Sequence, residues 1–328
     1  MARCTPHSYH SFGRGYRPGR QWGKWRLIPS IFLLLVPAHT SAQAWRPSGE
    51  FRISTDVELV LLDVSVKQAR GGYVSGLTKN NFQIYENGRL QKITEFASAD
   101  IPVAVGLVFD DSGSMRSKRP DVITAGLVFI GASNPQDQIF VVNFNDKVRR
   151  GLPETVPFTD DIKLLRSALS RDMAEGQTAL YDAIALSLDH LQSGRREKKT
   201  LVVVSDGGDN VSTHTLKELM QLVQESRATI YTIGIFDVLD MDRNPRVLKA
   251  LAQATGGERF LPKSPGELLQ ACQQIAREIR SGYTIGFVPP DRDGNFHRLR
   301  VGIEPPDTRR LSVRTRPGYF AAGGMTRP

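Results

Sequence analysis

The fold is decided at residues 101–114, IPVAVGLVFDDSGS, where an apolar run passes into a cluster of oxygen-bearing side chains. The run 101–108 is almost continuously apolar, as expected of a strand that is covered on both faces. Asp110, Ser112 and Ser114 then follow at every second position. One carboxylate and two hydroxyls at a strand end can surround a single point, so the stretch predicts a buried strand that ends in a ligand site.

Similar apolar runs recur downstream and alternate with helical periodicity. We predict strands at 103–109, 138–144, 200–205 and 229–236. Between the second and third of these, apolar residues keep helical spacing at Leu180, Ile184, Leu188 and Leu191. Short apolar strands that alternate with helices are typical of a doubly wound, mostly parallel α/β sheet, which we expect over residues 101–282.

The last helix of this block has clear limits. Residues 264–267, SPGE, combine an N-cap serine, a first-turn proline and a capping-box glutamate. Cys272 lies in the apolar stripe that follows, so we expect a buried side chain and not a reactive thiol. Gly282 stands where a left-handed glycine after the helix is expected.

The flanking segments are rich in strand-like patterns. We predict strands at 57–66, 82–86 and 90–96 before the α/β block, with Asn87-Gly88 as a two-residue hairpin turn. Further strands are predicted at 283–288, 297–303 and 311–315. Segments 45–100 and 283–328 are each too small to bury a core alone. We therefore expect them to form one small β-sandwich with the α/β domain inserted between them; the alternative is two loose appendages.

Residues 1–44 have the pattern of a cleaved secretory signal peptide. They carry six Lys or Arg and no Asp or Glu, a short apolar run at 27–36, and Ala42-Gln43-Ala44 as a cleavage site. The apolar run is about half the ~20 residues that a membrane-spanning helix needs, so no stable membrane anchor is expected after cleavage. The pattern predicts an exported protein, periplasmic or secreted.

Charge and cysteine content exclude other classes. Without residues 1–44 the net charge falls from +9 to +3, and basic and aromatic residues are not interleaved, so nucleic acid is not an expected partner. Only Cys272 remains outside that segment, which excludes an internal disulfide.

Two more polar pieces follow predicted elements. Thr178 comes after Gly176 and before a helix, and Asp206 follows the strand at 200–205. Because ligands of parallel sheets bind at the carboxyl ends of the strands, we expect these loops to meet the first one. Together they offer only hard oxygen ligands, which suit Mg²⁺, Mn²⁺ or Ca²⁺ and not zinc. The predicted ligands are Asp110, Ser112, Ser114, Thr178 and Asp206.

These pieces, in this order, resemble the metal-ion-dependent adhesion site (MIDAS) of von Willebrand factor type A (VWFA) domains. The likeness covers about 101–282, and the whole chain, with its ending Arg314-x-Arg316-Pro317-Gly318-Tyr319-Phe320, is similar to exported bacterial VWFA-related proteins. The resemblance implies a Rossmann-like sheet and a protein-binding or adhesion module. In it, Ser112, Ser114 and Thr178 would ligate the cation directly or nearly so, and the two aspartates directly or through water. An open coordination position would capture an Asp or Glu carboxylate of a partner.

Asp111 departs from the small or hydroxyl residue common at its position. We expect it to face solvent; the alternative is that its charge shifts the site toward Ca²⁺.

Catalytic alternatives are weaker. A phosphatase of the haloacid dehalogenase type needs a second aspartate where Ser112 stands, and no Gly-x-Ser-x-Gly, His-Glu-x-x-His or P-loop motif is present. His190, His214 and His297 are expected at the surface or as helix caps. A metal-dependent hydrolase that uses Asp111 or Asp209 as base remains the alternative function. The alternative without a metal is that these loops only cap helices and turns.

Overall fold

The computed structural model describes residues 59–68, 71–98, 100–171, 174–236, 243–304 and 311–323. The predicted signal segment, 1–44, lies outside the described residues. Within these ranges, no helix combines the length and apolar character needed to cross a bilayer.

The central sheet has six strands in the order β10-β9-β8-β5-β6-β7. Neighbouring strands are parallel except β7, which runs antiparallel to β6. The bounds are β5 Val103–Asp110, β6 Gln138–Phe144, β7 Val148–Arg150, β8 Lys198–Ser205, β9 Thr229–Gly234 and β10 Arg259–Phe260. The predicted α/β fold is therefore confirmed, although β9 ends two residues before its predicted end.

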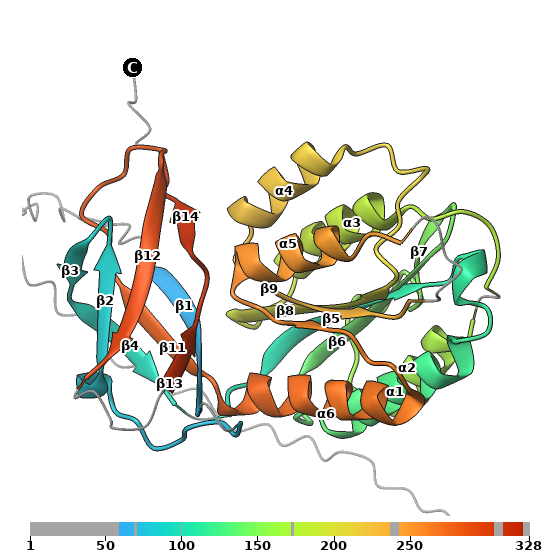
Figure 1. Ribbon diagram of the computed structural model, residues 1–328, viewed down its shortest axis with the longest axis horizontal. Helices are drawn as coiled ribbons and strands as arrows, with labels where there is room; N and C mark the ends of the chain where they lie inside the picture. Colours follow the sequence, from blue (N-terminus) through green and yellow to red (C-terminus); the bar gives the residue numbers. More distant parts are fainter. Residues whose placement is uncertain are drawn as a thin grey trace, which may run out of the picture. The chain divides into compact units, whose positions relative to one another are not determined.

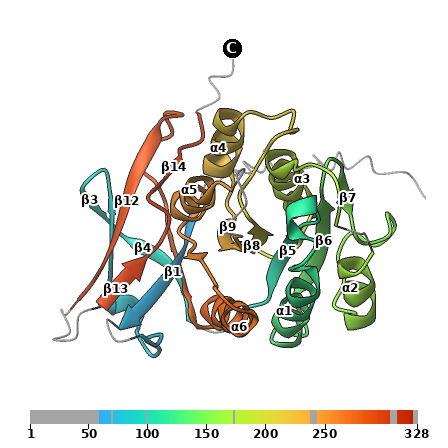
Figure 2. The same ribbon diagram turned by 45° about the vertical axis from the view of Figure 1, so that its right-hand side comes forward.

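Helices cover both faces of this sheet (Figures 1 and 2). One face carries α1, α2 and α6, and the other carries α3, α4 and α5. Their bounds are α1 Arg119–Gly131, α2 Ile162–Leu169, α3 Leu180–Gln192, α4 Leu216–Glu225, α5 Pro245–Thr255 and α6 Pro265–Ser281; two short 3₁₀ turns span Lys79–Asn81 and Gly113–Met115. Cys272 lies in the core as predicted, and burial raises the pKa of its thiol to about 12.

Strand β5 is buried along its whole length because sheet neighbours and helices enclose it. Gly106 at its middle leaves room for two large neighbours: a Cβ there would lie 2.4 Å from the ring of Phe140 and 2.5 Å from Leu201. This dense centre holds the strand end at Asp110 in a fixed place.

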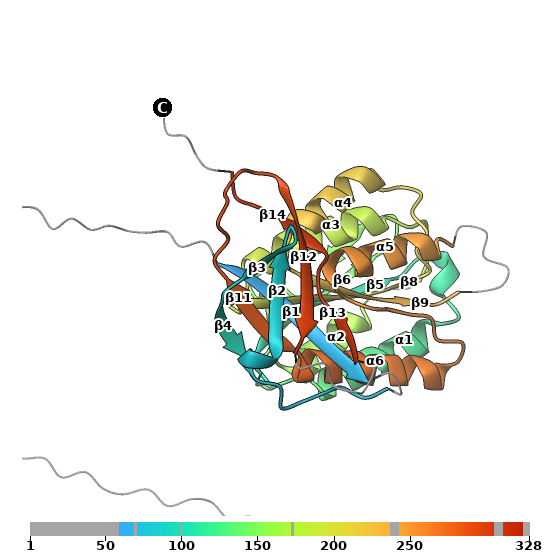
Figure 3. The ribbon, with the colours of Figure 1, turned by 60° about the vertical axis from the view of Figure 1, so that its left-hand side comes forward.

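The flanking segments form two four-stranded antiparallel sheets, ordered β13-β1-β11-β4 and β14-β12-β2-β3 (Figure 3). Leu62, Tyr283 and Phe287 of the first sheet share one core with Ile84 and Val301 of the second. The segments before and after the α/β domain thus build one sandwich, as predicted. The strands are β1 Val60–Gln68, β2 Phe82–Glu86, β3 Arg89–Gln91, β4 Ile93–Ala97, β11 Tyr283–Phe287, β12 Phe296–Ile303, β13 Leu311–Arg314 and β14 Gly318–Phe320. The domain limits at 45–100, 101–282 and 283–328 stay predictions.

The single strand predicted at 90–96 was wrong. Asn87 and Gly88 do form a tight turn with φ of 48° and 83°, and β3 pairs back onto β2. The chain then leaves that sheet at Lys92, and β4 pairs with β11 in the other sheet. One continuous strand-like run therefore passes from one sheet of the sandwich to the other. The alternation of apolar and polar residues does not reveal this change of sheet.

The expected left-handed glycine after α6 was also wrong. Gly282 is extended, with φ −74° and ψ 161°, and the chain passes directly from α6 into β11. The α/β domain and the sandwich are therefore joined by a helix that becomes a strand without an intervening loop.

A charged cluster joins the sandwich to the α/β domain. Glu278 of α6 accepts hydrogen bonds from Tyr73 (2.8 Å) and Tyr231 (3.0 Å) and forms ion pairs with Lys67 and Arg314. Glu258 pairs with the same two cations. We call Lys67, Tyr73, Tyr231, Glu258, Glu278 and Arg314 the junction cluster.

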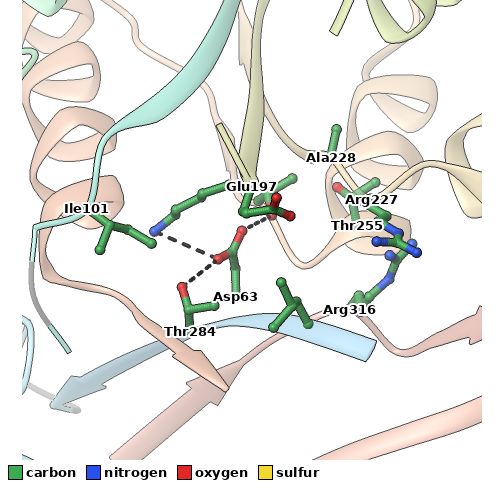
Figure 4. Close-up of a pocket in the computed structure, with 11 residues that line it drawn as sticks. Asp63, Ile101, Glu197, Arg227, Ala228, Thr255, Thr284 and Arg316 are labelled. Carbon is green, nitrogen blue, oxygen red and sulfur yellow. Dashed lines mark hydrogen bonds and ion pairs between the residues drawn. The ribbon is translucent and has the colours of Figure 1, made fainter. Parts of the chain in front are cut away.

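Asp63 of β1 makes a second set of contacts between the sandwich and the α/β domain (Figure 4). It accepts hydrogen bonds from Thr284 (3.4 Å) and Thr229 (3.2 Å), and Lys198 lies 3.8 Å from it. Arg316 donates to the carbonyls of Gln224 and Ser226, at the end of α4.

Candidate metal centre

The candidate site lies where neighbouring parallel strands end. Strand β5 ends at Asp110 and β8 at Ser205, directly before Asp206. The two strands pair in register, Phe109 opposite Val204, so their carboxyl ends emerge side by side. This is the edge at which open parallel sheets bind ligands.

Hydrogen bonds draw the first and third loops together. Ser205 Oγ donates to Asp110 Oδ2 at 2.6 Å, and Ser114 Oγ donates to Asp206 Oδ2 at 2.6 Å. The hydroxyls of Ser112 and Ser114 lie 3.1 Å apart, and the Ser112 N–H donates to Asp110 Oδ1. Four of the five predicted residues thus belong to one connected cluster.

Thr178 comes from the second of the three loops in chain order, which lies before α3 and is bound to the loops after β5 and β8. The Gly113 N–H donates to the Gly176 carbonyl at 3.1 Å, which places this loop beside the first. Asn210 Oδ1 accepts from the Thr178 N–H at 2.9 Å, and the Asn210 N–H donates back to the Thr178 carbonyl. Thr178 is buried there; no hydrogen bond of its hydroxyl is seen among the described residues.

Ser205 and Asn210 are the two residues that sequence reasoning missed. Both sit next to the motif that follows β8, yet Ser205 reads as strand and Asn210 as a turn residue. Ser205 binds Asp110, 95 positions away, and Asn210 binds Thr178, 32 positions away. Because these partners are remote in sequence, only the fold reveals the two contacts.

The two carboxylates are buried together. Asp110 and Asp206 are each 2% exposed. Burial and the charge of Asp206 raise the pKa of Asp110 to about 7, although hydrogen bonds from Ser112 and Ser205 oppose the rise. Ser114 is exposed, so the cluster opens to solvent on that side.

The expectation that Asp111 faces solvent was wrong. Asp111 is 3% exposed and forms an ion pair with Arg119 at the start of α1. Its N–H donates to the Phe144 carbonyl, and its carbonyl accepts from the Glu175 N–H. The extra charge is therefore matched inside the chain.

Comparison with known proteins agrees with this geometry. Residues 105–208 match the sequence profile of the von Willebrand factor type A domain. This part of the chain is a von Willebrand factor type A domain. Domains of this family are typically binding modules without catalytic activity, and many bind divalent cations.

Individual relatives are distant. The uncharacterized protein sll0103 of Synechocystis is 24% identical over 208 residues, which are 58% of this chain and 46% of that protein, so the chain spans less than half of this relative. A von Willebrand factor type A structure from Catenulispora acidiphila has a TM-score of 0.50 at 16% identity, over 83% of this chain and 76% of that one. The corresponding domain of the type V pili tip protein Mfa5 from Porphyromonas gingivalis has a TM-score of 0.46 at 16% identity, over 55% and 95%. The likeness to the Catenulispora structure bears on the fold alone.

The histidines of the chain lie in separate places. His297 was expected at the surface or as a cap, but it is buried between Glu86 (2.9 Å) and Asp293 (3.0 Å) in the sandwich. Burial lowers its pKa, but the two carboxylates outweigh this and raise it overall. His214 contacts Asp182 of α3, and the ring of His190 packs at a tilt of 55° against that of Phe140, with 4.4 Å between their centres.

The donor set fits a hard divalent cation. In the described part of the chain, neither Asp110 nor Asp206 forms an ion pair with a Lys or Arg. The described residues also contain no group of three His, Cys, Asp or Glu placed to hold a metal, so a cation bound here would also need hydroxyl, carbonyl or water oxygens. Carboxylate and hydroxyl oxygens without nitrogen or sulfur suit Mg²⁺, Mn²⁺ or Ca²⁺. The metal-ligating role of the five residues stays a prediction.

Proposed function

We propose that this protein is an exported, metal-dependent protein-binding module of the adhesion type. Asp110, Ser112, Ser114, Thr178 and Asp206 would hold Mg²⁺, or Mn²⁺ or Ca²⁺, in a MIDAS-type site. A carboxylate of a protein partner would complete the coordination of the cation. The observation that carries the proposal is the buried Asp110–Asp206 pair, which the described residues leave without a compensating cation.

Burying ionised groups is costly unless an opposite charge or a metal compensates them. The raised pKa of Asp110 shows that the pair carries this cost in the isolated chain. A divalent cation matches the two negative charges and would remove it.

The chemistry of the partner follows from the same count. Three of the proposed ligands are neutral hydroxyls and only two are anionic, so the bound cation carries no excess negative charge and can accept one further oxygen ligand in its coordination sphere. The exposed position of Ser114 supplies the side from which a partner can approach. An Asp or Glu side chain is a hard oxygen ligand and matches the preference of these cations.

Among the described residues, Oδ1 of each candidate base of the alternative hydrolase is held by other groups of the chain. Asp111 pairs with Arg119, and Asp209 accepts hydrogen bonds from the Tyr181 N–H and from Ser212. These were the two candidate bases of the alternative hydrolase, and both are engaged. We therefore propose a binding role and no catalysis.

Export rests on the pattern of residues 1–44, a basic stretch, a short apolar run and an Ala-x-Ala site. We propose that the protein acts outside the cytoplasm, in the periplasm or released.

Isothermal calorimetry with Mg²⁺, Mn²⁺ and Ca²⁺ tests the proposal. We expect binding by the unaltered protein, and loss of binding in Ser112→Ala and Asp206→Asn. Ser117→Ala, an exposed serine three residues beyond Ser114, is the matched control and should bind as the unaltered protein does. Absence of binding for all three ions would refute the proposal. Turnover of a phosphate or ester that disappears in Asp206→Asn would favour the hydrolase.

A further inference from the structure

A groove of about 690 Å³ lies between α3 and α4, which run side by side in Figure 2. It begins at Asp146 and Ala179, next to the loop that carries Thr178, and extends to Leu222 and Ser226 at the end of α4. The Ala179 N–H donates to the carbonyl of Asn145, which ties the segment next to Thr178 to the loop after β6. The volume is within the usual range of ligand-binding pockets.

Apolar side chains line the groove away from the core. Leu186 of α3 lies off the stripe Leu180, Ile184, Leu188 and Leu191 that faces the sheet, and it is only partly buried. Leu222 of α4 is 37% exposed, while Leu219 and Val223 of the same helix are buried. Leu186 and Leu222 thus lie off the core faces of their helices, and Leu188 of the stripe also lines the groove.

The rim of the groove is acidic. Asp146, Asp189 and Glu225 are exposed carboxylates, and Asp182 is half-buried and bound to Thr213 and His214. Among the described residues that line the groove there is no Lys or Arg. Apolar lining with an acidic rim complements a ligand that is apolar on one side and cationic at its edges.

The sign of the charge changes at the far end. A second hollow of about 420 Å³ shares Leu188, Gln192, Glu225 and Ser226 with the groove and adds Arg196, Lys199 and Arg227. The described lining of the groove therefore contains carboxylates without Lys or Arg, whereas the adjoining hollow also carries three cationic side chains.

We propose that this groove receives a basic, leucine-bearing helical segment of the partner protein, adjacent to the carboxylate that reaches the cation. Its Lys or Arg residues would face Asp146, Asp189 and Glu225, and its apolar side would cover Leu186 and Leu222. A helix laid into a groove between two helices is a common mode of peptide recognition. The inference rests on the proposed function where it concerns the partner carboxylate that reaches the cation. Binding of the basic segment to the groove does not itself require the metal.

Fluorescence anisotropy with designed peptides tests this. The first probe is a labelled 16-residue amphipathic helix of Leu and Lys; the second carries one added Glu at its end; the third replaces every Lys by Glu. Each is titrated with the full chain in EDTA and in Mg²⁺. We expect the first probe to bind equally in both, the second to gain affinity with Mg²⁺, and the third not to bind.

Charge reversal locates the binding surface. Asp189→Lys combined with Glu225→Lys should weaken binding of the Leu/Lys probe about tenfold or more, because attraction becomes repulsion. Glu154→Lys combined with Asp160→Lys makes the same change in net charge at exposed positions outside the groove, and should change affinity less than about twofold. Leu222→Ser should weaken binding about fivefold through the lost apolar contact.

Equal losses in the two double variants, or equal binding of the all-Glu probe, would overturn the proposal. So would a dimer of the chain in sedimentation that disappears on reversal of Asp189 and Glu225, because the groove would then belong to a second copy. Asp206→Asn should remove only the Mg²⁺-dependent gain of the second probe. Groove binding without any effect of Mg²⁺ would support the basic segment and refute the proposed function, so the two failures are distinguishable.

Discussion

The protein contains two pairs of carboxylates that differ in how their charge is met. At the junction, Glu258 and Glu278 face Lys67 and Arg314, which come from the sandwich. At the end of the sheet, Asp110 and Asp206 receive hydrogen bonds from serines, and no ion pair with Lys or Arg is seen in the described residues. A buried charge that the chain compensates is part of the architecture. A buried charge that the chain leaves uncompensated indicates where a ligand of opposite charge is expected to bind.

The pKa values differ in the same way. For Glu258, burial alone would raise the pKa, but Lys67 and Arg314 outweigh it and hold the pKa below its usual value. For Asp110, burial and the charge of Asp206 act together and raise the pKa to about 7. The same residue type thus has opposite shifts because its neighbours differ in sign.

The largest expected effect is at the junction. Glu278→Gln removes the buried one of the two carboxylates that Lys67 and Arg314 contact, while Glu258 still pairs with both cations, so we expect the free energy of unfolding to fall by about 1–3 kcal/mol. Urea denaturation measures it. Arg277→Gln, an exposed neighbour on the same helix, is the control and should change stability by less than about 0.5 kcal/mol. Equal effects of the two substitutions would remove the distinction between the clusters.

The opposite result is expected at the sheet end. Asp206→Asn removes the repulsion with Asp110, and the amide can still contact Ser114 and the Gly208 N–H. We expect the metal-free protein to gain on the order of 1 kcal/mol, while the stabilisation of about 2.7 kcal/mol by Mg²⁺ at 100 times its Kd disappears. Thermal melts with EDTA and with Mg²⁺ check both. A loss of stability as large as that of Glu278→Gln would contradict the comparison.

The two clusters should contribute to stability with opposite dependence on pH. Because the folded pKa of Asp110 is raised from 3.8 to about 7, its contribution is fully present below about pH 4 and is lost as the pH rises through 7. Glu258 has a lowered pKa, so its contribution is present above its unfolded pKa and is lost as the pH falls below it. Urea midpoints of the metal-free protein should therefore decline between pH 5 and 7.5, and Asp110→Asn should flatten this decline. An unchanged slope in Asp110→Asn would assign it to another group.

The smallest effect concerns Asp111. Since Arg119 already matches its charge, Asp111→Asn should change the Mg²⁺ affinity by less than about threefold, whereas Asp206→Asn should abolish binding. Calorimetry compares the two. A loss of binding in Asp111→Asn would place that carboxylate in the metal centre.

Much of the fold could be predicted from local pattern. The strand predicted at 138–144 coincides with β6, and the boundary signals at 264–267 correctly mark the start of α6. These features are local, because burial on both faces and helix capping are written in consecutive residues. The corner between β3 and β4 was missed for the opposite reason: a run of strand-like residues does not say which sheet it joins.

The candidate site was predicted in part. The spacing of Asp110, Ser112 and Ser114 and the strand-end position of Asp206 placed four side chains correctly in one cluster. The burial of Asp111 was missed because Arg119 reaches it from the next helix. His297 was missed because the pairing of β12 with β2 brings it to Glu86, 211 residues away.

The sequence by itself determined which strands are buried, how they alternate with helices, and which oxygen-bearing residues stand at their ends, because these depend on apolar periodicity between near neighbours. Only the tertiary structure decided which charges are matched. Coulomb attraction acts between groups that the fold brings within a few ångströms, whatever their separation along the chain. Lys67 and Arg314 thereby meet Glu278, while Asp110 and Asp206 meet each other.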